Sequence, residues 1–246
     1  MNFIKPVQIV LFGESGSGKS HIAASFVKEF DGIVLDISGT IQRAAGKGRT
    51  SEYTTQMYGH SAYACENVGI DFERQYKLIC TWEDFEKAVD YAMAYRDELT
   101  QKPNKRIWVV VDDTSDLRWK AAIHQANVNK HASIAQDDWG GASTDMRIAF
   151  TKLAANFNVI YLCQMKDEMA NKESTGKRVG AFYPPSMNHI VEVCGQWSVA
   201  TNPKAHHFNI EKSNIDWDIM EEFPKTLVNP TPQSILESVR LNKNVW

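Results

Sequence analysis

The chain has 246 residues, of which 43% are hydrophobic and 23% charged, and its formal net charge is −3. This is the composition of an ordinary globular protein, and the length suffices for one large domain. No apolar run approaches the roughly 20 residues that cross a membrane, and no signal-peptide pattern opens the chain. We therefore expect a cytoplasmic protein without a membrane partner, in which any nucleic-acid binding comes from local basic segments.

Strand-like and helix-like segments alternate along the chain, which predicts an α/β fold with a mainly parallel sheet flanked by helices. Apolar runs predict strands at 7–12, 32–36, 76–80, 107–111 and 159–163. Helical patterns are expected at 21–30, 81–100, 144–156, a short stretch at 188–194, and from 231 onward. Polar, glycine-bearing segments predict an irregular excursion at 40–75 and a loop at 166–185, and alternation on both sides of 202–204 predicts a β-hairpin. We expect one domain over 1–246, with its core at 7–215 and a C-terminal extension at 216–246.

The four cysteines, at positions 65, 80, 163 and 194, form no C-x-x-C pair. Cys80 and Cys163 lie in apolar runs. We therefore expect buried thiols in a reducing cytosol, and neither disulfides nor a zinc site.

The segment that joins the first predicted strand to the first predicted helix is the most specific pattern in the chain. It reads Gly13-Glu14-Ser15-Gly16-Ser17-Gly18-Lys19-Ser20, a full G-x-x-x-x-G-K-[ST] phosphate loop. In this context backbone N–H groups and the helix N-terminus bind phosphate oxygens. We expect Lys19 to reach the terminal phosphates and the Ser20 hydroxyl to ligate Mg²⁺. The chain is thus predicted to bind a nucleoside triphosphate.

Two carboxylates, Asp112 and Asp113, follow the apolar strand predicted at 107–111. A carboxylate at the C-terminal end of a central strand lies beside the phosphate loop, so Asp112 is predicted to hold Mg²⁺, usually through water. Asp113 has two interpretations that the sequence does not separate. It polarises the attacking water, or it caps a turn or helix that contains Leu117.

Gln164 ends the next predicted central strand. An amide at that place faces the γ-phosphate edge of the sheet, so we predict that Gln164 senses whether this phosphate is present. The alternative is a satisfied polar residue at a strand end.

Taken in order, these segments resemble the RecA/RadA recombinase superfamily, from the phosphate loop through 35–40, 109–117 and the Gln164 strand to 206–214. The chain looks most like the small core-only RecA-like ATPases of bacteriophages that are associated with single-strand annealing and recombination. The resemblance implies a RecA-like P-loop core that binds ATP and Mg²⁺ in the cytoplasm of a bacterial host. It also implies assembly into a ring or filament on single-stranded DNA, with a single-strand-binding protein as a further candidate partner.

The resemblance further implies two DNA-contacting segments, at about 120–142 and 167–185. Their candidate contacts are Lys120, His124, Lys130 and His131 in the first, and Lys172, Lys177, Arg178, Phe182 and Tyr183 in the second. Basic side chains neutralise phosphates, and aromatic rings stack on unpaired bases. The alternative is a pair of solvated loops whose charges serve solubility.

The chain departs from the family at the usual catalytic glutamate, since it reads Asp36-Ile37-Ser38 after the second predicted strand. Ser38 cannot act as a base. Either Asp113 or Asp36 replaces the glutamate, or hydrolysis is slow and ATP acts mainly as a conformational ligand. Lys212 resembles a position that reaches the nucleotide of a neighbouring subunit, and an exposed strand lysine is the alternative.

These expectations favour a DNA-stimulated ATPase, and two other classes stay open. One is an ATP-dependent loader or remodeller that acts through protein contacts. The other is a phosphotransferase with a small acceptor, which is disfavoured because such enzymes usually offer an arginine-rich lid. The loop predicted after Gln164 contains a single arginine, Arg178.

Overall fold

The computed structural model describes residues 6–30, 32–38, 79–99, 107–170, 173–181, 187, 190–213 and 225–238. The excursion expected at 40–75 lies outside these residues, as do Lys172, Phe182 and Tyr183. For Lys212 the backbone is described and the side chain is not. What the sequence predicts for these residues stays a prediction.

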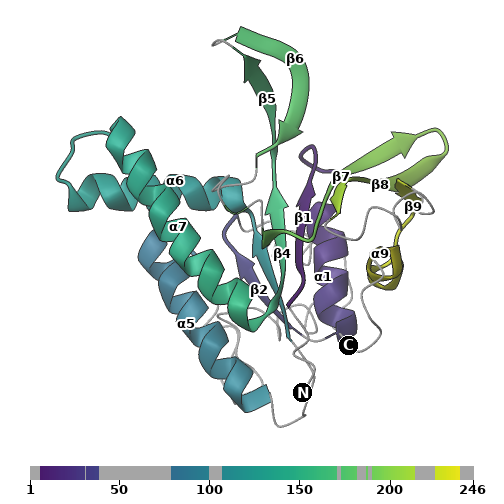
Figure 1. Ribbon diagram of the computed structural model, residues 1–246, viewed down its shortest axis with the longest axis horizontal. Coiled ribbons are helices and arrows are strands. Elements are labelled where there is room, and N and C mark those ends of the chain that lie inside the picture. The colour runs from purple at the N-terminus through teal and green to yellow at the C-terminus, as the bar shows by residue number, and fades with distance from the viewer. Residues whose placement is uncertain are drawn as a thin grey trace.

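Seven strands of the described chain form the central sheet, in the order β2-β3-β4-β1-β7-β8-β9 (Figure 1). Their bounds are β1 Gln8–Phe12, β2 Gly32–Asp36, β3 Trp108–Asp112, β4 Asn158–Cys163, β7 Val193–Thr201, β8 Lys204–Ser213 and β9 Thr226–Val228. The pairs from β2 to β7 are parallel, and β7–β8 and β8–β9 are antiparallel. The expected α/β architecture, a mainly parallel sheet with flanking helices and a C-terminal β-hairpin, is confirmed.

Helices cover both faces of the sheet (Figure 1). On one face lie α1 (Lys19–Phe30) and α9 (Pro232–Ser238), and on the other lie α5 (Trp82–Leu99), α6 (Thr114–Val128) and α7 (Gln136–Asn156). Among the described residues, every helix is too short or too polar to cross a bilayer.

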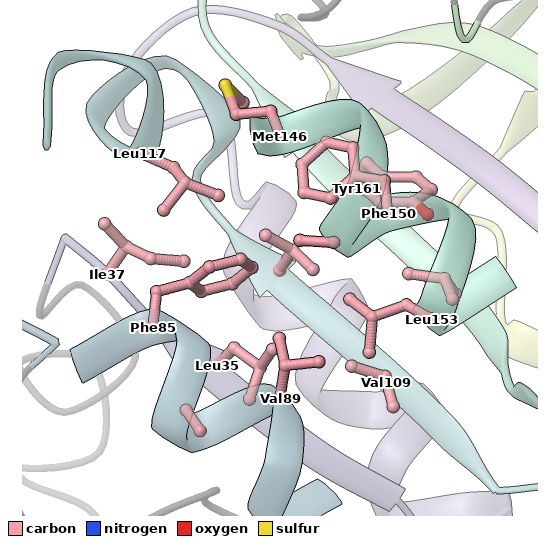
Figure 2. Close-up of a cluster of buried hydrophobic side chains, with 14 of the residues drawn as sticks. Leu35, Ile37, Phe85, Val89, Val109, Leu117, Met146, Phe150, Leu153 and Tyr161 are labelled. Carbon is pink, nitrogen blue, oxygen red and sulfur yellow. The ribbon is translucent and has the colours of Figure 1, made fainter. Parts of the chain in front are cut away.

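The strand side chains alternate between two buried hydrophobic clusters, as central parallel strands require. In β3, Val109 and Val111 face the α5–α7 layer, whereas Trp108 and Val110 face the α1–α9 layer. Figure 2 shows the first cluster, in which side chains of the helices surround those of the strands. Its labelled members include Phe85, Val89, Phe150 and Leu153 from helices, and Leu35, Val109 and Tyr161 from strands.

The first segment expected to be a DNA-contacting loop is largely helical, which corrects the prediction. Residues 120–128 belong to α6, and α7 begins at Gln136, earlier than the expected start at Thr144. The sequence hid α6 because its apolar residues lie on two faces: Leu117 is buried, while Trp119 is 56% exposed. Such a helix shows no single apolar stripe.

The second such segment is also regular, because its residues form a two-stranded sheet of β5 (Met165–Ala170) and β6 (Glu173–Gly180). This hairpin extends away from the carboxyl ends of the central strands (Figure 1). Residues 173–178 of β6 are exposed, so neither of its faces carries the apolar alternation by which a strand is recognised.

Three smaller predictions also need correction. Ile79 and Cys80 belong to no strand, while 76–78 lie outside the described residues. The helix expected at 188–194 is wrong at its end, because β7 begins at Val193. Cys163 is buried as expected, but Cys80 is exposed.

Candidate functional site

The phosphate loop connects β1 to α1, as the sequence predicts. Gly16 (φ +78°) and Gly18 (φ +97°) adopt a left-handed backbone that favours glycine. Gly13 is required for space, because a Cβ there would lie 2.2 Å from the carbonyl oxygen of Trp197. The conformation and the close approach therefore explain all three glycines of the loop.

Two side chains of the β7–β8 hairpin support this loop, and the sequence did not reveal them. The indole Nε1 of Trp197 donates a hydrogen bond of 2.9 Å to the Ser17 carbonyl. The His206 ring packs against Trp197 with ring centroids 5.7 Å apart. A Cβ at Gly18 would be 3.2 Å from His206 Cε1, so the imidazole lies against the loop. These contacts depend on the pairing of β7 with β1, which no local pattern encodes.

Lys19 begins α1 and turns back over the loop. Its Nζ donates hydrogen bonds to the carbonyls of Gly13, at 2.8 Å, and Glu14, at 2.9 Å. Burial lowers the pKa of Lys19, while the negative charges of Asp112 and Asp113 oppose this shift. The two carboxylates therefore stabilise the ammonium at the centre of the site.

A pocket of about 380 Å³ unites the phosphate loop with Ser20, Asp112, Asp113 and Gln164. Strand order explains why these distant segments meet: β4 lies between β1 and β3, so the carboxyl ends of the three strands are adjacent. The side chains predicted for phosphate, metal and sensing therefore lie around one cavity. His21 and Asp116 line it as well and were not predicted.

Ser20 and Asp112 are the residues that fit a magnesium ion. Asp112 ends β3 and is 3% exposed, and both residues line the same pocket. Mg²⁺ prefers hard oxygen ligands and is usually held by one or two carboxylates together with substrate phosphates. A hydroxyl and a carboxylate beside a phosphate loop suit that coordination.

Asp113 connects the pocket to α6. One carboxylate oxygen, Oδ1, accepts a hydrogen bond of 2.8 Å from the Asp116 backbone N–H and thereby caps the helix. The other oxygen, Oδ2, accepts a bond of 2.9 Å from Gln164 Nε2. Capping is confirmed, and it leaves one carboxylate oxygen directed at the sensor candidate. The two interpretations of Asp113 are therefore compatible.

The position of the missing glutamate also lies at this pocket. Ser38 lines the pocket, whereas Asp36 is not among the described residues that line it. Asp36 is buried at the end of β2, where it stands in register with Asp112. The geometry thus favours Asp113 over Asp36 as the carboxylate available to a reacting water.

The described candidates for DNA contact lie on two separate elements. Lys120 is on α6, where its Nζ donates to the Cys80 carbonyl at 3.1 Å, and Lys130 is exposed beyond the end of that helix. Lys177 and Arg178 are on β6 and are exposed. Of these four described residues, Arg178 contacts the phosphate loop, through an ion pair of 2.5 Å with Glu14.

No protein-family model matches the chain, and no curated protein matches it. Solved structures do match, among them the ATP synthase subunit NeqB from Nanoarcheaum equitans. That match has 13% identity and a TM-score of 0.47, and covers 80% of this chain and 46% of NeqB, so the chain spans about half of that protein. The RadB recombinase matches at 11% identity and a TM-score of 0.43, over 86% of this chain and 84% of its own. An ATPase from the type III secretion system of pathogenic bacteria matches at 11% identity and a TM-score of 0.48. That match covers 97% of this chain and 61% of the ATPase.

Proposed function

We propose that the chain is a RecA-like, Mg²⁺-dependent ATPase that assembles on single-stranded DNA during recombination or annealing. The observation that carries the enzymatic part is the single pocket shared by the phosphate loop, Asp112, Asp113 and Gln164. The DNA part rests on the resemblance described above and on the exposed basic side chains of β6.

The phosphate end of ATP fits the loop between β1 and α1. Backbone N–H groups and Lys19 bind its oxygens, and Lys19 exchanges its hydrogen bonds to the Gly13 and Glu14 carbonyls for bonds to phosphate. Ser20 and Asp112 would hold Mg²⁺, which would neutralise part of the phosphate charge.

Asp113 and Gln164 orient the attacking water. Asp113 Oδ2 accepts its proton, and the Gln164 amide, already bonded to that oxygen, fixes the direction of the carboxylate. Because Asp113 is also held by the Asp116 N–H, the pair is rigid before a water arrives. In this proposal Asp113 takes the role of the catalytic glutamate, whose usual position is occupied by Ser38 in this chain.

The β5–β6 hairpin is the proposed element through which bound nucleotide changes the affinity for DNA. β5 begins directly after Gln164, and the Ala181 N–H, just beyond β6, donates to the Gln164 carbonyl at 2.8 Å. Arg178 on β6 bonds to Glu14 of the phosphate loop and to the Met165 carbonyl at 3.1 Å. The hairpin therefore contacts Gln164 and Glu14, and a rearrangement of the pocket that moves these residues would also move the hairpin.

ATP hydrolysis with and without a single-stranded oligonucleotide tests the proposal. We expect DNA to stimulate hydrolysis and Lys19→Ala to abolish it. Lys204→Ala, at the exposed first residue of β8, should not abolish it. Hydrolysis without stimulation, together with no oligonucleotide binding in an ATP analogue, would contradict the DNA part. A stable complex with a single-strand-binding protein under those conditions would instead support the loader, and phosphate transfer to a small acceptor would support the phosphotransferase. Sedimentation with ATP analogue tests the proposed homo-oligomer, in which Lys212 would reach the nucleotide of the neighbouring subunit.

A further inference from the structure

A second cavity, which we call the α6 pocket, has a volume of about 340 Å³ and lies between the start of α5 and one face of α6. Its α6 residues recur at helical spacing, so they form one continuous stripe. They are Asp116, Trp119, Lys120, Ile123, His124 and Asn127. Lys120 and His124 are among the candidate DNA contacts described above, but no function has yet been given to the cavity itself.

The wall of the α6 pocket is aromatic and accessible. Trp119 is 56% exposed and Ile123 is 49% exposed, although both are large apolar side chains on a regular helix. Trp119 is held edge-on to Trp139 of α7, with centroids 4.9 Å apart and planes at 79°. The Arg118 guanidinium in turn lies 4.6 Å from the Trp139 ring centroid. Trp119 is thus an oriented ring that still offers half of its surface.

Polar contacts hold the two sides of the α6 pocket together around this ring. Lys120 Nζ bonds to the Cys80 carbonyl at 3.1 Å, and His124 Nδ1 lies 2.7 Å from Glu83 Oε1. The Asn127 side chain lines the far end of the stripe. An amide can donate and accept at once, as the edge of a nucleobase requires.

Basic side chains flank the α6 pocket, beside the two carboxylates, Glu83 and Asp116, that line it. Helix α6 carries three basic side chains against one acidic side chain, in a protein whose net charge is −3. The basic residues are Arg118, Lys120 and His124, and Lys130 and His131 follow at the end of the helix. A strand that places a base on Trp119 would therefore find cations for its phosphates along the same helix.

We propose that the α6 pocket binds one unpaired nucleobase of single-stranded DNA, stacked on Trp119. This inference rests on the proposed function and adds a defined base site to it. The site communicates with the nucleotide pocket through Asp116, which lines both cavities and whose N–H bonds to Asp113. A base in the α6 pocket thus lies against the helical turn that positions the proposed water-binding carboxylate.

The first test measures oligonucleotide affinity, in ATP analogue, of Trp119→Ala, Trp119→Phe and a matched control. Val128→Ala is that control, because Val128 is an exposed apolar side chain on the same helix and does not line the α6 pocket.

 The exposed fraction of Val128 is 60%, close to the 56% of Trp119, so the two substitutions are matched in exposure. Loss of base stacking predicts that Trp119→Ala weakens binding about 5- to 150-fold, while Trp119→Phe and Val128→Ala stay near the wild-type affinity. Wild-type-like affinity of Trp119→Ala, with its melting temperature unchanged, would overturn the inference and leave the DNA-binding function standing.

The second test locates the base by photocrosslinking with an oligonucleotide that carries 5-iodouracil. We expect the crosslinked peptide to contain Trp119, and crosslinks confined to the β5–β6 hairpin would again overturn the α6 pocket alone. Free 5-iodouridine distinguishes the source of the base. A crosslink of this nucleoside to Trp119, in a chain that binds no oligonucleotide, would keep the nucleobase site and refute the proposed DNA function.

Discussion

Substitution of Asp113 separates its role as a helix cap from its proposed role in catalysis. In Asp113→Ala, α6 loses its capping bond to the Asp116 N–H, and Gln164 loses its carboxylate partner. The cap contributes about 1 kcal/mol and the second bond, to an exposed amide, about 1 kcal/mol. Unfolding should therefore become easier by about 2 kcal/mol, which lowers the melting temperature of a chain of this size by about 4–8 °C.

Asp113→Asn is the matched variant. Asparagine caps helices about as well as aspartate, and the Gln164 amide can turn its oxygen toward the new NH₂ group. We expect the free energy of unfolding to stay within about 0.5 kcal/mol of the wild type. The amide cannot accept a proton from water, so single-turnover ATP hydrolysis should fall by about 10²–10⁴-fold in both variants.

The assay pairs thermal unfolding with single-turnover hydrolysis at saturating ATP and Mg²⁺. An Asp113→Asn protein that hydrolyses ATP at the wild-type rate would refute the catalytic role and leave Asp113 as a cap. A loss of stability in Asp113→Asn as large as in Asp113→Ala would refute the account of the cap.

Two further predictions concern packing and pH. A Cβ in Gly180→Ala would lie 2.6 Å from Cγ of Phe12, which is buried, so we expect a loss of about 1–3 kcal/mol in urea unfolding. Gly140→Ala is its control, because nothing lies within 4 Å of the new Cβ and α7 should gain about 0.5–1 kcal/mol; equal effects of the two substitutions would contradict this reasoning. Hydrogen bonding, chiefly from His131, lowers the pKa of Asp138 from 3.8 to about 2. A carboxylate with a lowered pKa stabilises the fold fully above its unfolded value and loses this effect as pH falls toward the folded value. The melting temperature should therefore decrease less steeply between pH 3.8 and about 2 in Asp138→Asn than in the wild type, and identical slopes would refute the assignment.

Much of the nucleotide site could be predicted from the sequence because its parts are local. The phosphate loop is one contiguous segment, and Asp112 and Gln164 each end a predicted strand. Parallel strands present their carboxyl ends at one edge, so motif and strand pattern together predict a shared site. The pocket that unites these residues agrees with this prediction.

The sequence failed where an element lacks a one-sided apolar pattern. Helix α6 buries Leu117 and exposes Trp119, and the β5–β6 hairpin is exposed over most of its second strand. Periodicity records the burial of one face, so it misses helices with two apolar faces and strands with none. Both elements were expected to be loops in whole or in part.

The sequence by itself therefore determined the fold class and a phosphate-binding loop, because strand, loop and helix follow one another without interruption. Only the tertiary structure decided which distant residues complete the site. Trp197 reaches the loop because β7 pairs with β1, and Gln164 meets Asp113 because β4 lies beside β3. Strand order sets these contacts, and it follows from the packing of the whole sheet and its helices. No short segment of the chain encodes it.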